Sequence, residues 1–452
     1  EILNRDWQSM VDLFREENVP LETEESKLGQ QYQENMGALT VEFQGEEKTL
    51  VQMGVYLQET DRSVRQEAWE RVAGRRLQVS EECDRQFDDL KDLRIQIAAN
   101  AGFGDYRDFK HVAKGRVDYQ PEDCFKFHEA VEKVVMPAYN EMLAGRRSKL
   151  GLDTLRPWDT SVDPDGLEPL RPFTEVEEMV AKTKGIFDQV DGELATGFQT
   201  MRDGQLLDLA NRKGKAPGGY QSSLPEARLP FIFMNSVGLQ RDVETLLHEA
   251  GHAFHTLAAQ DEDIHEYQHA PLEFCEVASM SMELVGNEHL EEFYSHDDCV
   301  RARRQHLEGI IGLFPWIATV DAFQHWIYTH PKHTLEERDE AWNGLLDRFG
   351  GDIDWSGHEK ARTKMWHRQS HIFLVPFYYI EYGIAQLGAL GVWNNSKTDR
   401  AQALLDYKKA LALGGSRPLP ELFAAANIPF QFDTEAFKPL VELIQSELAA
   451  LK

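Results

Sequence analysis

Two histidines four residues apart constrain this chain more than any other feature of its sequence. They are His248 and His252, within residues 244–255, ETLLHEAGHAFH, and Glu249 follows the first of them. On a helix, positions i and i+4 lie on one face a single turn apart, so both imidazoles can point at one ion. Apolar residues recur at helical spacing, and no proline interrupts residues 241–260. We therefore predict a helix that holds both histidines and Glu249 at one site.

The H-E-x-x-H spacing is typical of zinc sites that keep one coordination position open for water, on which Glu249 would act. The alternative is a pair of solvent-facing histidines with an acidic neighbour, because the motif also arises by chance in helices. Two observations favour the metal site: the helix is too apolar for both histidines to be solvated, and Gly251 lies inside it. A helical glycine costs about 1 kcal/mol relative to alanine, which is reasonable where another segment must approach closely.

A third ligand has to come from elsewhere in the chain. The extended motif H-E-x-x-H-x-x-G-x-x-H is excluded, because His255 stands at the position of its glycine and Ala258 at that of its last histidine. His255 lies on the face of His248 but two turns away, too far along the helix for tetrahedral closure. We interpret His255 as a packing residue or an outer partner of the site.

Residues 271–286, PLEFCEVASMSMELVG, predict a second helix that supplies this ligand. Glu276 lies among apolar residues, where an unpaired carboxylate is costly and a metal ion removes the cost. Glu283, seven residues further on, is placed to hold the second nitrogen of a histidine ligand. The alternative for Glu276 is an exposed surface acid.

The composition limits which kinds of molecule this chain can bind. The chain has 452 residues, and 48 basic against 77 acidic residues give a net charge of −29. This balance argues against nucleic-acid binding, which needs a basic face. A negative cleft would attract basic peptides, although solvated acidic helix faces explain the charge more simply.

Four cysteines without C-x-x-C spacing fit a reducing cytoplasm, and no apolar run is long enough to span a membrane. We expect a cytoplasmic protein with no nucleic-acid or membrane partner.

Most of the chain has a helical pattern, at residues 1–36, 61–100, 121–150, 176–190 and from residue 301 onward, with 383–393 as a buried core helix. Residues 39–50 predict a short hairpin that turns at Gln44 and Gly45. Residues 156–172 are rich in proline and predict a loop, a candidate hinge or lobe boundary. We therefore predict a mainly α fold.

Residues 213–235, KGKAPGGYQSSLPEARLPFIFMN, are the only convincing β region. The apolar run 231–234 follows Pro230, and proline confines such a strand to the edge of a sheet. An edge strand just before a zinc helix can pair with an extended peptide and hold it across the metal. The alternative, a small structural sheet, is compatible with that role.

Residues 371–382, HIFLVPFYYIEY, set His371 and three tyrosines in an apolar background. Tyr378 and Tyr382 are predicted one helical turn apart. Buried tyrosine hydroxyls need partners and remain donors at pH 7. That suits them to stabilise the oxyanion that forms when water adds to an amide. The alternative is an aromatic core segment.

Four segments together carry a family resemblance: HEAGHAFH, FCEVASMSMELV, KAPGGY followed by LPFIFMN, and HIFLVPFYYIEYGIAQLGAL. They resemble the oligoendopeptidase F branch of the thimet oligopeptidase family of zinc metallopeptidases. The similarity extends from about residue 40 onward and is dense over residues 213–393. It implies a two-lobed helical zincin of the neurolysin type, with one zinc ion at the floor of a deep central channel and a small β-sheet beside the zinc helix. It also implies short peptides, rather than folded proteins, as substrates.

The resemblance assigns roles residue by residue. It implies His248, His252 and Glu276 as zinc ligands and Glu249 as the catalytic acid/base. It implies contacts to the substrate and the tetrahedral intermediate from His371, Tyr378 and Tyr382, and substrate binding by Gly219, Tyr220 and Tyr379. The Pro-Ser-Gln that commonly follows the ligand glutamate in the thimet branch reads Ala278-Ser279-Met280 here. The N-terminal part is also shorter than in typical relatives, which puts size exclusion of substrates in question.

We predict a zinc metalloendopeptidase that hydrolyses internal bonds of short oligopeptides, with residues 1–200 as an N-terminal helical lobe and 201–452 as the catalytic zinc-binding lobe. One alternative is a metallocarboxypeptidase or dipeptidyl carboxypeptidase on the same fold, which would need a group for the substrate's C-terminal carboxylate. Another is a peptide-binding protein with a vestigial metal site, which the intact Glu249 disfavours.

Overall fold

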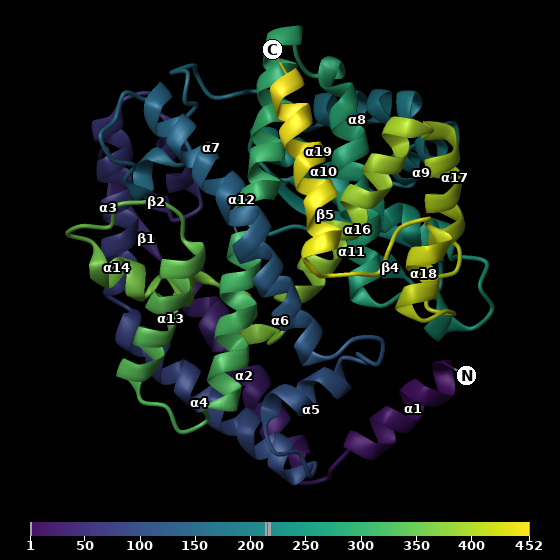
Figure 1. Ribbon diagram of the computed structural model, residues 1–452. Helices are drawn as coiled ribbons and strands as arrows, with labels where there is room; N and C mark the ends of the chain where they lie inside the picture. Colours follow the sequence, from purple (N-terminus) through teal and green to yellow (C-terminus); the bar gives the residue numbers. More distant parts are fainter. Residues whose placement is uncertain (1, 213–214, 216–217, 452) are drawn as a thin grey trace. The chain divides into compact units, whose positions relative to one another are not determined.

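The computed structural model describes residues 2–212, 215 and 218–451, shown in Figure 1. Residues 213, 214, 216 and 217, which belong to the predicted β region and in part to its KAPGGY motif, lie outside the described residues. Helices make up 69% of the structure, which confirms the mainly α fold class. The deep central channel stays a prediction. None of the helices described is both long enough and apolar enough to cross a membrane.

The chain forms two units, each assembled from separate stretches of sequence. Unit 1 consists of Glu1–Trp7, Leu170–Ile310 and Glu381–Lys452, and unit 2 of Gln8–Pro169 and Ile311–Ile380. The H-E-x-x-H helix and Glu276 belong to unit 1. The two consecutive lobes, residues 1–200 and 201–452, stay a prediction of domain organisation.

Unit 1 combines helices with a small sheet. Its regular elements are α8 (Val176–Val190), α9 (Gly192–Asp203), β3 (Leu207–Ala210), β4 (Tyr220–Leu224), β5 (Leu229–Ser236), α10 (Gln240–Ala258), η4 (His265–Gln268), α11 (Leu272–Gly286), η5 (Asn287–Glu292), α17 (Arg400–Leu411), α18 (Leu419–Ala425) and α19 (Thr434–Ala450). Two longer helices, α12 (His296–Thr329) and α16 (Tyr379–Thr398), contribute residues to both units. α8 coincides with the helix predicted over residues 176–190. Residues 383–393 lie in α16 and are almost all buried, which confirms the predicted core helix.

The sheet of unit 1 has the strand order β3-β5-β4, with β3 parallel and β4 antiparallel to β5. The edge position predicted for residues 231–234 is therefore wrong, because β5 is the central strand. Pro230 is tolerated because β3 pairs with β5 only from Ile232 onward. Pro230 therefore has a neighbouring strand on one side only, where it lies opposite Ser223 of β4. The edge strand beside α10 is β4.

A tight turn leads from β5 into α10. The carboxylate of Asp242 accepts hydrogen bonds from the backbone N–H groups of Val237, Gly238 and Leu239, at 2.7, 2.8 and 3.0 Å. A carboxylate in the first helical turn satisfies backbone donors and complements the helix dipole. The helix then buries an apolar face completely, through Val243, Leu246, Leu247, Ala250 and Ala253. The contacts of Asp242 set where α10 begins, and the buried apolar face sets how the helix is rotated about its axis.

Gly251 is the point at which α10 and α11 approach most closely. A Cβ atom there would lie 2.5 Å from the Cα of Ser279 and 2.6 Å from the carbonyl oxygen of Ala278. The sequence prediction that another segment approaches at this glycine is confirmed. α17 supports the same contact, because the hydroxyl of Tyr407 donates to the carbonyl of Ala278 at 2.9 Å.

Unit 2 is helical apart from one hairpin. Its elements are α2 (Asn18–Gly37), β1 (Thr40–Phe43), β2 (Glu46–Thr49), η1 (Gln52–Gln58), α3 (Arg62–Leu77), α4 (Ser80–Asn100), α5 (Tyr106–Ala113), α6 (Pro121–Ala130), η2 (Val131–Val135), α7 (Met136–Lys149), η3 (Pro157–Asp159), α13 (Leu335–Phe349), α14 (Glu359–Thr363), η6 (Met365–Arg368) and α15 (Ser370–Leu374). α1 (Ile2–Leu13) contributes residues to both units. The predicted hairpin is confirmed, with Gln44 and Gly45 at positive φ in its two-residue loop. The long helical pattern over residues 61–100 resolves into two helices, α3 and α4.

Candidate metal and catalytic site

Helices α10 and α11 bring His248, His252 and Glu276 together. One ligand atom from each lies within 4.8 Å of the other two. The Nε2 atoms of His248 and His252 lie 3.3 and 3.6 Å from the same oxygen, Oε2 of Glu276. Nitrogen and oxygen ligands at about 2.0–2.2 Å from a tetrahedral ion are separated by about 3.3–3.6 Å. The three atoms are thus spaced as ligands of one ion.

The pKa values of the two imidazoles are shifted in opposite directions. Burial lowers the pKa of His252 to about 4, so this ring is neutral at pH 7 and can offer its lone pair to a metal ion. Burial also disfavours the charged form of His248, but its contacts with Glu276 and Glu283 outweigh burial and raise its pKa. The alternative for Glu276, an exposed surface acid, is excluded, because the residue is only 4% exposed.

The carboxylate of Glu283 contacts the second ring nitrogen of His248, as predicted. The Nδ1 of His248 lies 2.6 Å from Oε1 of Glu283, and the Nε2 of His306 lies 3.1 Å from Oε2. Burial opposes the charged carboxylate, but these two contacts lower the pKa of Glu283 to about 2. The carboxylate therefore stays ionised and keeps the Nε2 of His248 directed at Glu276. His306, from α12, was not predicted, because no spacing rule connects it to the motif.

Glu249 is buried beside the three ligand residues. It is 6% exposed, and its Oε2 has no hydrogen-bond partner among the residues that the structure describes. Burial is the main cause that raises its pKa to about 7, against an opposing effect from His248. A backbone hydrogen bond from Gln221, in β4, also acts on this carboxyl group. A carboxyl group with a pKa near neutrality can both accept and release a proton at pH 7.

Strand β4 lies along α10 at the edge of the sheet. The side chains of Gln221 and Ser223 both contact the hydroxyl of Thr256 in α10, at 3.2 and 3.0 Å. Tyr220 is half exposed, with its ring stacked on Phe233 at a centroid distance of 4.9 Å. Among the described strands, β4 pairs on one side only, with β5. Its other edge can accept an extended backbone.

Gly219 directly precedes β4. A Cβ atom there would lie 3.3 Å from Met234 and 3.3 Å from Thr245 of α10. A side chain at this position would therefore separate the start of the edge strand from the helix. The substrate-binding role of Gly219 and Tyr220 stays a prediction.

The three predicted oxyanion donors, and Tyr379, which is predicted to contact the substrate, belong to two units. His371, Tyr378 and Tyr379 lie in unit 2, and Tyr382 lies in unit 1 with the three ligand residues. His371 contacts the rings of Tyr378 and Tyr379, with centroids 5.5 and 5.0 Å away. Its Nδ1 lies 2.7 Å from the side-chain amide of Gln369. The roles of all four residues toward substrate stay predictions.

The backbone before Tyr379 differs from the expected helix. α16 begins at Tyr379, so Tyr378 lies outside it, and the prediction that Tyr378 and Tyr382 are one turn apart on a single helix is wrong. The cause is Phe377, which has a φ of 62°. Its N–H donates to the side-chain oxygen of Gln324 at 2.8 Å, and its carbonyl accepts from Arg116. These contacts hold a backbone conformation that residues other than glycine rarely adopt.

His255 is a packing residue. It is 4% exposed, and its ring lies 6.0 Å from that of Phe274 in an edge-to-face contact. Burial lowers its pKa to about 3, so it is neutral at pH 7. The predicted packing interpretation is confirmed.

Known proteins are similar to this chain in sequence and in fold. Residues 55–438 match the model of peptidase family M3. Group B oligopeptidase PepB of Streptococcus agalactiae serotype III (strain NEM316) is 23% identical over 65% of this chain and 49% of its own length. The chromosomal oligoendopeptidase F of Lactococcus lactis subsp. cremoris is 22% identical over 70% of this chain and 52% of its own. The chain thus spans about half the length of these relatives.

Solved structures extend the likeness over nearly the whole chain. PZ peptidase A, solved with an inhibitor, superposes with a TM-score of 0.94 at 30% identity, over 99% of this chain and 80% of its own. An oligoendopeptidase F from Enterococcus faecium superposes with a TM-score of 0.64 at 16% identity, over 94% of this chain and 72% of its own. At 16% identity, the likeness to the Enterococcus faecium structure shows only that the fold is shared.

Proposed function

The chain belongs to peptidase family M3, and from this we propose that it is a zinc metallopeptidase that hydrolyses internal bonds of short oligopeptides. The observation that carries the proposal is the convergence of two imidazole nitrogens on one carboxylate oxygen, at 3.3 and 3.6 Å. His248, His252 and Glu276 would hold one zinc ion. When bound, the ion supplies a Lewis acid that polarises the scissile carbonyl and lowers the pKa of a water molecule toward neutrality.

Glu249 is the proposed general base and acid. Its carboxyl group takes a proton from the attacking water and then delivers it to the leaving amine. The pKa of about 7 and the unpartnered Oε2 among the described residues support both halves of this role. A peptide laid along the edge of β4 would have its backbone beside α10, the helix that carries Glu249. His371, Tyr378 and Tyr382 are the proposed donors to the oxyanion, with Gly219, Tyr220 and Tyr379 contacting the substrate.

Short, unfolded peptides are the proposed substrate class. Pairing with an edge strand needs an extended backbone, which a folded protein rarely presents. The names of the relatives, oligopeptidase and oligoendopeptidase, agree with this class. The alternative on the same fold is a carboxypeptidase or dipeptidyl carboxypeptidase, and a fluorogenic peptide blocked at both ends distinguishes the two. Cleavage of the blocked peptide supports the endopeptidase, and cleavage of only the unblocked peptide supports the alternative.

The decisive variant is Glu249→Gln. It keeps the size of the side chain and leaves the three proposed ligands intact, so metal content should be unchanged. Loss of the proton carrier should lower kcat by about 10²–10⁴-fold. Glu442→Gln, at an exposed position on α19, is the control and should retain normal activity. Normal turnover by the Glu249→Gln protein would refute the mechanism.

A further inference from the structure

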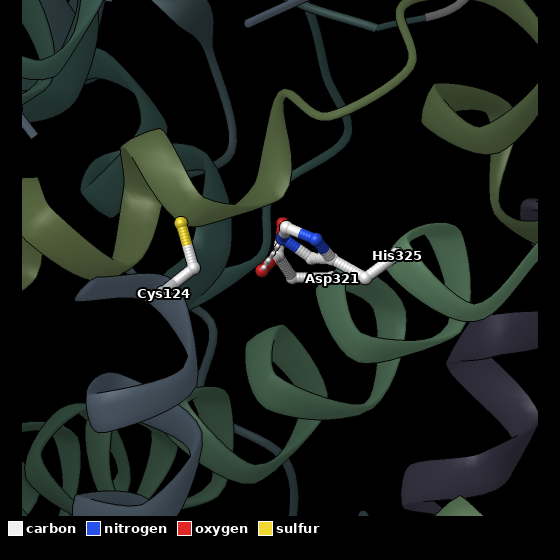
Figure 2. A group of neighbouring side chains, drawn as sticks. All are labelled: Cys124, Asp321 and His325. Atoms are coloured by element: carbon white, nitrogen blue, oxygen red, sulfur yellow. Dashed lines mark ion pairs between the residues drawn. The ribbon is translucent and has the colours of Figure 1, made fainter. Parts of the chain in front are cut away.

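Unit 2 contains a second group of metal-ligating side chains, far in sequence from the H-E-x-x-H motif. It consists of Cys124 from α6 and of Asp321 and His325, one turn apart on α12 (Figure 2). One ligand atom from each lies within 4.8 Å of the other two. Figure 2 shows the carboxylate and the imidazole side by side on one helix, with Cys124 on the other helix. The three residues are buried, at 1%, 0% and 6% exposure.

The carboxylate at this place has the same type of surroundings as Glu276. The Nε2 atoms of His128 and His325 lie 2.8 and 3.3 Å from one oxygen of Asp321, Oδ2. At the first site, two Nε2 atoms likewise converge on one oxygen of Glu276. Cys124 adds a sulfur donor that the first site lacks. Unit 2 therefore also sets two imidazoles around one buried carboxylate and adds a thiol, but His128 contacts the carboxylate through a direct hydrogen bond.

Two polar atoms of the group have no hydrogen-bond partner among the described residues. They are Oδ1 of Asp321 and Nδ1 of His325. An unsatisfied buried polar atom costs about 1–3 kcal/mol, so an unoccupied group of this kind is expensive to keep. Aromatic rings pack against the imidazole: those of Phe125 and Phe377 lie 4.9 and 5.3 Å from that of His325.

We propose that Cys124, Asp321 and His325 bind a second divalent metal ion of the zinc class. A thiolate, an imidazole and a carboxylate form a donor set that suits Zn²⁺ or Co²⁺, whereas Ca²⁺ and Mg²⁺ prefer oxygen ligands alone. His128 is a positioning residue, because its contact with Oδ2 orients the carboxylate toward the ion.

Charge balance supports a dication among these buried groups. One carboxylate and one thiolate carry two negative charges, which one divalent ion neutralises, whereas unbalanced buried charges are costly. On binding, the thiol S–H bond breaks, a sulfur–metal bond forms, and the proton leaves to solvent without any change of oxidation state. The ion would cross-link α6 to α12 and so stabilise unit 2. Because the ligands are buried, we expect the ion to enter as the chain folds.

The first test removes the other metal site. The full chain carrying His248→Ala and His252→Ala is expressed with added zinc, and its metal content is measured by mass spectrometry. We expect about one zinc ion per chain to remain. Adding Cys124→Ser should remove it, whereas Cys83→Ser, which changes a buried cysteine outside the group, should not. A metal-free His248→Ala, His252→Ala protein would overturn the proposal.

The second test needs no substitution in unit 2. The unaltered chain is expressed with cobalt in place of zinc, and its near-ultraviolet spectrum is recorded. A thiolate ligand gives an intense sulfur-to-cobalt charge-transfer band, which the nitrogen and oxygen ligands of the first site cannot give. We expect this band in the unaltered chain and in the Cys83→Ser control. A cobalt protein without the band would overturn the proposal, even if the Cys124→Ser chain failed to fold.

Discussion

At the scale of single residues, Glu283 orients the imidazole of His248, a proposed metal ligand. Its carboxylate contacts His248 and His306, at 2.6 and 3.1 Å, and nothing in the sequence motif requires it. Replacing Glu283 with Gln keeps the shape but removes the charge that orients the imidazole. We expect the metal dissociation constant to rise about 10–100-fold. Competition with a chromogenic chelator measures it.

Glu288→Gln is the matched control for this prediction. Glu288 also lies in unit 1 and pairs with Lys397 at 2.7 Å, outside the metal site. Its substitution should leave the metal dissociation constant unchanged. If Glu283→Gln bound metal as tightly as the unaltered chain, the orientation of His248 would have to come from packing alone.

At the scale of elements, the contact of α10 with α11 brings together the three proposed ligand residues. Alanine at Gly251 would place its Cβ 2.5 Å from the backbone of Ser279, so the helices must move apart. Overpacking of this kind costs about 1–3 kcal/mol, and it also separates Glu276 from the two histidines. We expect Gly251→Ala to lower both the free energy of unfolding and the affinity for zinc, measured by denaturation and by chelator competition.

Alanine at a helical glycine with free space around it should have the opposite effect on stability. Gly309, in α12, has no atom within 4 Å of the position that a Cβ would take among the described residues. Gly309→Ala should stabilise the protein by up to about 1 kcal/mol, because alanine favours the helix. A loss of stability in the Gly309→Ala protein would show that free space around the Cβ does not decide how alanine affects stability at these helical glycines.

The segment that carries the tyrosines depends on a second element-scale contact. Gln324 accepts the N–H of Phe377, whose φ of 62° turns the chain before α16. Gln324→Met leaves that N–H without its partner and should cost about 1–3 kcal/mol in unfolding free energy. If Tyr378 acts on the substrate as proposed, kcat should fall while zinc content stays normal. An unchanged kcat in a destabilised protein would show that the turn serves folding alone.

The sequence predicted local features of the structure well and long-range features less well. The i, i+4 histidines, the Gln44-Gly45 hairpin and the helix over residues 176–190 each follow from a short-range rule, and all are confirmed. His306 and the central position of β5 depend on which segments meet in space, which no local pattern specifies. Phe377 shows the same limit at one residue, because its positive φ is held by Gln324 and Arg116, from other elements.

At the scale of the whole molecule, the net charge of −29 and a buried ion pair oppose each other as pH falls. Protonation toward the isoelectric point near 5.0 reduces self-repulsion and should stabilise the fold. Asp159 has the opposite effect. It is fully buried and bonded to Arg62 at 2.7 Å and Arg65 at 3.2 Å. Burial raises its pKa, but these bonds and the backbone N–H of Arg156 outweigh burial and lower it.

A difference measurement separates the two effects. Because the folded pKa of Asp159 lies below the unfolded value of about 3.9, its contribution is complete above that pH and is lost as pH falls through the folded pKa. Asp159→Asn should therefore lower the free energy of unfolding by about 3 kcal/mol at pH 7, and by progressively less below pH 4. The effect of net charge is nearly equal in both proteins and cancels in the difference. Urea denaturation of both proteins from pH 7 to pH 3 measures this, and a difference that stayed constant over that range would show that the ion pair does not govern acid stability.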